Sequence, residues 1–182
     1  MKQLIENTFP CQTGKCIEIR NEAIFWIDEY LEDVDNFERL RGKSFVIIET
    51  DNELLFTVRN PSHKDVHFLA IDYGIFKDTK EYAGGRCDFA LFDDKRFCFI
   101  ESKNATLRQR NKERLSSFVQ LKDTINKFKE HLDFGNYQIE AQVSFQSNKK
   151  VYPRETSSHQ SKVLEFEIEL NVALFENNDI EF

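Results

Sequence analysis

The sequence predicts a mixed α/β (α+β) fold in which helices flank one mixed central sheet. Hydrophobic residues recur in some stretches at helical steps of three and four, and in others at the two-residue alternation of strands. The 182 residues are 40% hydrophobic and include 18 Phe, enough to form a sizeable core. Because the chain has only three Pro and six Gly, and no linker or repeat, we expect a single domain over residues 1–182.

The first half of the chain is expected to contain one helix and three strands. Apolar residues from Ile19 to Val34 recur at helical steps, which predicts a helix over residues 18–40. Residues 44–58 are expected to form a hairpin around the turn residues Asp51 and Asn52. Residues 66–73 are expected to form a further strand.

The second half begins with a turn at Gly84 and Gly85. Strands are expected at residues 87–92 and 97–103, joined by a tight turn, followed by a helix at 113–131 and a strand at 137–145. Residues 149–162 are expected to form a polar, basic loop. Residues 163–175 alternate between apolar and polar side chains, which predicts a half-buried strand.

Composition narrows the class of protein. No run of about 18 apolar residues could span a membrane, and the N-terminus lacks the apolar stretch of a signal peptide. We therefore expect a cytoplasmic protein with no membrane partner. In that reducing compartment the four Cys are expected to be thiols, and the spacing of Cys11 and Cys16 is too loose for a zinc knuckle.

Charge is distributed unevenly along the chain. The net charge is −7, yet residues 103–162 hold 12 Lys or Arg and only 6 Asp or Glu. A basic central block in an acidic protein is expected if one face meets a polyanion such as nucleic acid. The alternative is a solvated surface on which charges happen to cluster.

Three charged residues stand out within the apolar strands at 87–103. If Phe92 pairs with Phe97, Asp88 stands opposite Glu101, and Lys103 shares that face of the sheet. Opposed carboxylates repel and, when partly buried, must take up a proton or bind a cation. Their oxygens suit Mg²⁺ or Mn²⁺, which could activate a water and polarise a phosphoryl oxygen. The alternative is a Glu-x-Lys pair with no role beyond solubility.

Asp88 followed by Glu101-Ser102-Lys103 resembles the D…ExK signature of the PD-(D/E)XK nuclease superfamily. The resemblance implies a restriction-endonuclease-like αβββαβ core over about residues 17–146. An added C-terminal strand would lie in an extension of about residues 147–182. It also implies a Mg²⁺- or Mn²⁺-dependent phosphodiesterase, an endonuclease with DNA favoured. Asp88 and Glu101 would be the metal ligands, and Lys103 would position the attacking water. Cys87 stands where many members have Pro.

Other residues are candidates to complete such a site. Many members carry a catalytic Gln on the helix after the ExK strand, which Gln120 resembles. Some supply another Glu from the first helix, for which Glu22 is the candidate here. Asp72 could join the metal site or be structural. Six basic residues are candidates to hold a nucleic-acid backbone: Arg108, Arg110, Lys112, Arg114, Lys149 and Lys150.

Two other classes of function stay open. One is a catalytically silent, nuclease-like module that binds nucleic acid or a partner protein. The other is a structural subunit in which the Glu-x-Lys pair is incidental. Because the chain is short and acidic overall, an active nuclease is expected to need a separate targeting subunit or to form a homodimer.

Overall fold

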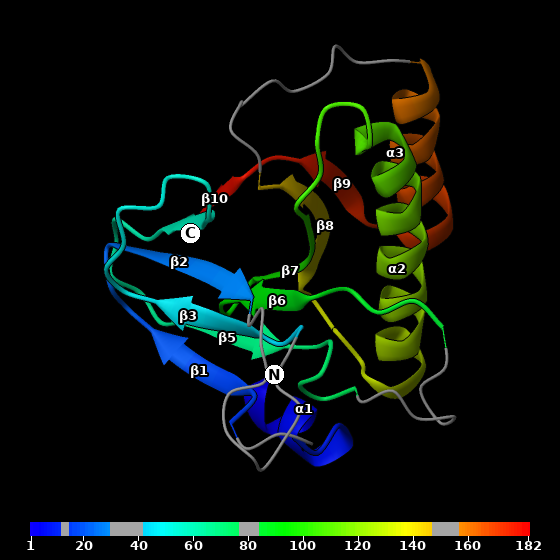
Figure 1. Cartoon of the computed structure of the whole chain (residues 1–182). Helices are drawn as coiled ribbons and strands as arrows, with labels where there is room; N and C mark the ends of the chain where they lie inside the picture. Colours follow the sequence, from blue (N-terminus) through cyan, green and yellow to red (C-terminus); the bar gives the residue numbers. More distant parts are fainter. Residues whose placement is uncertain (12–14, 30–41, 77–83, 147–156) are drawn as a thin grey trace.

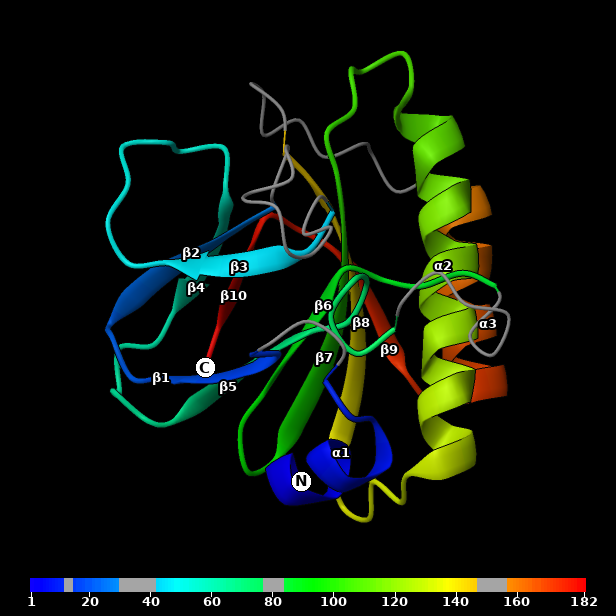
Figure 2. The same cartoon turned by 60° about the horizontal axis from the view of Figure 1, so that its bottom comes forward.

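The elements of the protein lie in layers, seen here in a computed structural model that describes residues 1–11, 15–29, 42–76, 84–146 and 157–182. Within these residues the chain forms three helices and two sheets, one of six strands and one of four (Figure 1). Helices α2 (Arg110–His131) and α3 (Ser157–Leu170) lie side by side against the larger sheet (Figure 2). The expected mixed α+β class is therefore confirmed.

The larger sheet has the strand order β1-β5-β6-β7-β8-β9. Its four first strands pair antiparallel, whereas β7, β8 and β9 pair parallel. Helix α2 makes the crossover from β7 to β8. The strands are β1 (Ile17–Arg20), β5 (Val66–Ala70), β6 (Phe89–Phe92), β7 (Arg96–Lys103), β8 (Gln138–Phe145) and β9 (Ala173–Glu176). The strands expected near residues 66–73, 87–92, 97–103 and 137–145, and the helix expected at 113–131, are confirmed.

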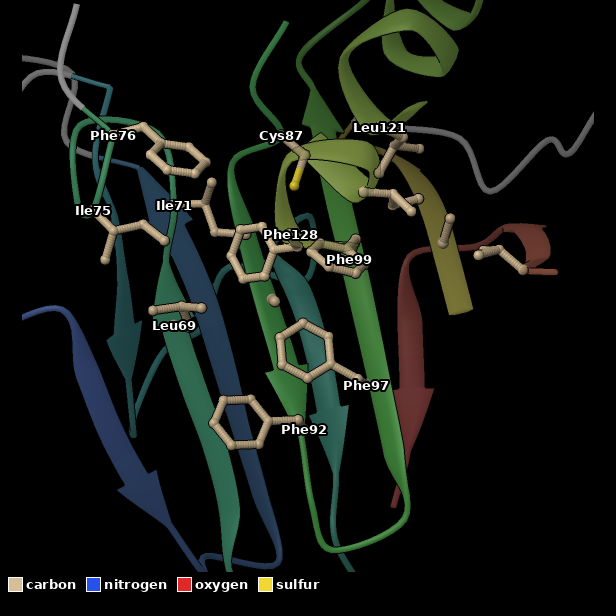
Figure 3. Close-up of a cluster of buried hydrophobic side chains, with 14 of the residues drawn as sticks. Leu69, Ile71, Ile75, Phe76, Cys87, Phe92, Phe97, Phe99, Leu121 and Phe128 are labelled. Carbon is tan, nitrogen blue, oxygen red and sulfur yellow. The ribbon is translucent and has the colours of Figure 1, made fainter. Parts of the chain in front are cut away.

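Both faces of the larger sheet are buried, because successive side chains of a strand point to opposite faces. Phe97 and Phe99 of β7 point toward the helices, where they pack with Leu121 and Phe128 of α2 (Figure 3). On the opposite face, residues such as Phe89 form a second apolar cluster with the smaller sheet. The larger sheet is thus the middle layer, which explains the uninterrupted apolar runs of its central strands.

The smaller sheet has the order β10-β4-β2-β3 and corrects the expectation of a first helix. Residues 18–40 do not begin as a helix: they form β1, a turn, and β2 (Ile24–Glu29), while residues 30–41 lie outside the described part. In β2, Phe25 and Ile27 are buried and their neighbours are partly exposed. A short run of apolar, β-branched and aromatic residues fits a strand, and its alternation outweighed the helical spacing.

The hairpin expected over residues 44–58 is also wrong in its pairing. Strands β3 (Ser44–Ile47) and β4 (Phe56–Arg59) both exist, but β2 lies between them and pairs antiparallel with each. A turn sequence between two strands does not fix their partners when a third strand can insert. Strand β10 (Asp179–Glu181) then adds in parallel to the other edge of β4.

The C-terminal strand expected over residues 163–175 is mostly helix. Helix α3 runs to Leu170, and only residues 173–176 form a strand, β9, at the edge of the larger sheet. Phe166 and Leu170, four residues apart, face the core, whereas Leu164 and Ile168 are exposed. The two-residue alternation therefore did not mark a half-buried strand. Of the basic loop expected over residues 149–162, residues 157–162 belong to α3 and the rest lies outside the described part.

The N-terminal segment contains α1 (Lys2–Thr8) and a disulfide between Cys11 and Cys16. The expectation of four thiols is therefore wrong for this pair and right for Cys87 and Cys98, which are free and buried. Within the described residues, no helix has the length and apolar character needed to cross a bilayer.

Candidate functional site

Asp88 and Glu101 are brought together by the β6–β7 pair. The observed register joins Phe92 to Phe97 and Phe89 to Ile100, as the sequence predicts. Asp88 immediately precedes β6, where it continues this register. Its side chain continues the pairing with β7, because Oδ2 accepts a hydrogen bond of 2.6 Å from the amide of Ser102. The neighbouring residue of β7 is Glu101, so the two acids lie at the same end of the strand pair.

Both carboxylates are withdrawn from solvent. Glu101 is fully buried and Asp88 is 9% exposed, whereas the Lys103 side chain is 23% exposed. Glu101 Oε1 forms an ion pair with the Lys103 ammonium. Glu101 Oε2 has no hydrogen-bond partner among the described residues. A buried carboxylate oxygen without a partner is costly, so this end of the sheet favours a proton or a cation.

Burial raises the pKa of both acids. The pKa of Asp88 rises from 3.8 to about 7, mainly because the site is desolvated, although the Ser102 amide and Lys103 act to lower it. The pKa of Glu101 lies well above its ordinary value through burial and the nearby Asp88 charge. Burial acts to lower the pKa of Lys103, but its pairing with Glu101 outweighs this and raises it. Both shifts favour a shared proton on the pair, which a bound divalent cation would displace.

Asp72 lies close to this pair, because its amide bonds the backbone carbonyl of Asp88, and its charge helps to raise the pKa of both acids. Its carboxylate also forms an ion pair with Arg86, at 2.8 Å between Oδ1 and Nε. Glu22 lies in the turn between β1 and β2, and its Oε1 is 3.7 Å from Arg20. The carboxylate of Glu22 also accepts a hydrogen bond of 3.1 Å from the amide of Asn21, so its described partners belong to its own loop. Asp72, in contrast, is joined to Asp88 by a hydrogen bond of 3.2 Å from its amide to the Asp88 carbonyl.

Gln120 lies on α2 beside the segment that leads into Asp88. Its side-chain amide donates a hydrogen bond of 2.9 Å to the backbone carbonyl of Arg86. Gln120 therefore contacts the backbone at Arg86, two residues before Asp88 in the sequence.

Glu29 and Tyr73 also lie near the site, although no sequence pattern marks them. Glu29, the last residue of β2, helps raise the pKa of Asp88, so its charge lies near the pair. Tyr73 has φ of 52°, unusual for a bulky residue, and its ring lies against Gly42 and under the Arg86 guanidinium. No local signal marks Glu29, because residues 18–40, which include β2, are expected from the sequence to form a helix.

The expected basic residues fall into distinct groups. Arg108 and Lys112 are exposed. Arg110 is buried against the ring of Phe145, and Arg114 makes two hydrogen bonds, of 2.6 and 2.9 Å, to the carboxylate of Glu176. Lys149 and Lys150 lie outside the described residues. Arg110 and Arg114 thus join α2 to β8 and β9, which leaves Arg108 and Lys112 as the exposed candidates for contact with a polyanion.

The donor set fits a hard divalent cation only in part. Asp88 and Glu101 supply two carboxylates, and no group of three or more His, Cys, Asp or Glu is placed to hold a metal within the described ranges. Mg²⁺ commonly binds through one or two carboxylates and keeps several waters, so two acids are compatible with it. Zinc, which prefers nitrogen and sulfur ligands, fits this pair less well.

The fold and site together define an α+β protein with a buried acidic pair and a lysine at the end of an antiparallel strand pair. Comparison of the chain with family models, with curated proteins and with solved structures finds no match.

Proposed function

We propose that the chain is a Mg²⁺- or Mn²⁺-dependent phosphodiesterase that cleaves nucleic acid, with DNA as the favoured substrate. The observation that carries the proposal is the buried Asp88–Glu101 pair with Lys103 beside it. A bound cation would offset the cost of burying two carboxylates together, and acids whose pKa values are raised in this way cluster at functional sites.

In this proposal Asp88 and Glu101 hold the cation. A cation held there would supply a Lewis acid that polarises a phosphoryl oxygen and lowers the pKa of a bound water. Lys103, which pairs with Glu101 in this structure, would orient the attacking water or stabilise negative charge that develops on the phosphate.

The order of elements around the site supports the resemblance to the PD-(D/E)XK superfamily. The antiparallel strands β5, β6 and β7 are followed by α2 and by β8, which is parallel to β7. This succession matches the βββαβ part of the core that the resemblance implies. The helix expected before it at residues 18–40 is replaced by β1 and β2, and the only described helix before β5 is the short α1.

A cleavage assay with matched variants tests the proposal. Plasmid DNA, single-stranded DNA and RNA are incubated with the protein while Mg²⁺ or Mn²⁺ is titrated. The expected result is metal-dependent cleavage by the parent and none by Glu101→Gln. The control is Glu140→Gln, because Glu140 is also a buried acid of the same sheet but pairs with Arg96, away from the site. It should lower stability and leave cleavage intact.

The assay also separates the other functions. If the parent cleaves none of the substrates and gains no thermal stability from either metal, the proposal fails. Salt-sensitive binding of nucleic acid without cleavage would then identify a silent binding module.

A further inference from the structure

Three side chains of α2 hold the backbone that leads into Asp88; we name Gln120, Asp123 and Thr124 the α2 clasp. Thr124 Oγ1 accepts a hydrogen bond of 2.8 Å from the amide of Cys87. Asp123 Oδ2 accepts one of 2.8 Å from the amide of Gly85, and Gln120 donates to the carbonyl of Arg86. Each of the three residues before Asp88 is therefore bound by a different clasp residue.

The contact between this segment and the helix is close. A Cβ atom on Gly85 would lie 2.7 Å from Cα of Gln120, within the backbone of α2. Only glycine allows the two backbones to approach to this distance. The fully buried Cys87 side chain lies in the same apolar cluster as Leu121 of α2 (Figure 3). The segment is thus packed against the helix as well as bonded to it.

The α2 clasp binds a segment that the larger sheet does not hold. Strand β6 begins at Phe89, so residues 85–87 have no strand partners in the larger sheet. After them, the carbonyl of Asp88 accepts hydrogen bonds from the amides of Ile71 and Asp72, and its carboxylate accepts one from Ser102. The position of Asp88 is therefore set by the two residues that follow β5 and by β7 on one side, and by α2 on the other.

We propose that the α2 clasp positions the Asp88 carboxylate beside Glu101 and so sets the affinity of the pair for a divalent cation. The proposal rests on the proposed function and assigns new roles to Asp123 and Thr124. It also changes the role of Gln120. That residue becomes a positioning residue that acts through the Arg86 carbonyl, in place of a catalytic one.

The test compares Thr124→Val with two matched variants. Valine keeps the shape of threonine but leaves the buried Cys87 amide without an acceptor. Thr124→Ser keeps the hydroxyl. Ser117→Ala removes another buried hydroxyl of α2, one that bonds only within the helix, to the carbonyl of Glu113. This last variant controls for a general loss of helix stability.

Two quantities are measured on the full chain: the dissociation constant for Mn²⁺, from the electron paramagnetic resonance of free Mn²⁺, and the hydrogen exchange of the Ser102 amide without metal. Thr124→Val should weaken Mn²⁺ binding about tenfold, which is the lower end of the effect of removing a group that orients a metal ligand. It should also speed exchange at Ser102, which reports whether the Asp88 carboxylate stays in place. Thr124→Ser and Ser117→Ala should match the parent in both.

Unchanged Mn²⁺ binding and Ser102 exchange in Thr124→Val would overturn the inference, as would equal effects in Ser117→Ala. If the parent binds no Mn²⁺, the proposed function is refuted, and so is the proposed effect of the clasp on metal affinity. Exchange at Ser102 then still decides whether the clasp positions Asp88.

Discussion

At the scale of single residues, the site combines strong apolar packing with charge. Phe97 and Phe99 precede Glu101 on the same face of β7, so the acid continues a buried aromatic row. Burial that stabilises the aromatic side chains penalises the carboxylate. The raised pKa values of Asp88 and Glu101 express that penalty, and they make the stability of the metal-free protein depend on pH.

Asp88→Asn should stabilise the metal-free protein at high pH. The pKa of Asp88 is about 7 in the folded chain and ordinarily 3.8, so between these values the folded chain holds a proton that the unfolded chain has lost. Stability contributed by this group is therefore present at low pH and is lost as pH rises to about 7. Asparagine avoids the loss and can still accept from Ser102. Above pH 7 the variant should gain up to roughly 4 kcal/mol, and near pH 4 almost nothing.

Urea unfolding in a chelator at about pH 4, 6 and 8 measures this difference in the free energy of unfolding. A difference that stays constant with pH would mean that the pKa of Asp88 is not raised by folding.

Lys103→Met should separate cleavage from metal binding. Methionine fills a similar volume but removes the ammonium that pairs with Glu101. The loss of a group that orients water or stabilises charge should lower kcat by about 10²-fold or more. Mn²⁺ affinity should stay the same or rise, because the cation no longer competes with the ammonium for Glu101. Parallel measurements of kcat and of the Mn²⁺ dissociation constant decide the point. A matching loss of both would make Lys103 a support for the metal ligands.

At the scale of elements, the sequence predicts those helices and strands whose partners lie nearby in the chain. The β6–β7 pair has a turn of few residues, so its register, and with it the proximity of Asp88 and Glu101, could be read from the sequence. The stripe of α2 was likewise visible, since Leu121, Ile125 and Phe128 recur at helical steps. Three of the candidate site residues, Asp88, Glu101 and Lys103, therefore lie together as the sequence predicts.

Elements that depend on distant partners were not predictable in the same way. Strand β2 is defined by pairing with β3 and β4 on both sides, and its four apolar residues fit helix or strand equally well. Helix α3 alternates like a strand, but its buried face packs on α2, where the ring of Phe166 contacts that of Phe118. For the same reason Glu29 and Thr124 were missed, because each approaches Asp88 only through tertiary packing.

The N-terminal end of α2 provides a prediction about substrate binding. Arg108 and Lys112 are exposed there, whereas Arg114 pairs with Glu176. Replacing both exposed residues by Ala should weaken binding to duplex DNA. It should also reduce the slope of log K against log salt by about 1 for each phosphate that the variant no longer neutralises. Arg114→Ala should lower stability and leave the slope unchanged. Fluorescence anisotropy over a series of salt concentrations measures both, and an unchanged slope in the double variant would exclude this end of α2 from the interface.

At the scale of the whole molecule, the last residues connect the two sheets. Strand β9 extends the larger sheet and β10 extends the smaller one, with only residues 177 and 178 between them. Arg96 of the larger sheet pairs with Glu140, donates to the carbonyl of Glu181, and lies over the ring of Phe182. Residues 173–182 are thus integrated in both sheets, although the sequence placed them in an extension of the core.

Phe182→Ala should therefore destabilise the whole protein. The Phe182 ring is 7% exposed and belongs to the apolar cluster between the sheets, whereas Phe175 of β9 is 45% exposed. Truncation of a buried Phe costs about 3 kcal/mol or more, so Phe182→Ala should lower the free energy of unfolding by about that amount. Phe175→Ala, the matched control, should cost less than about 1 kcal/mol, because much of its ring already contacts water. Chemical denaturation of both variants measures these decreases in the free energy of unfolding. If Phe182→Ala costs no more than Phe175→Ala, the ring of Phe182 does not stabilise the contact between the two sheets.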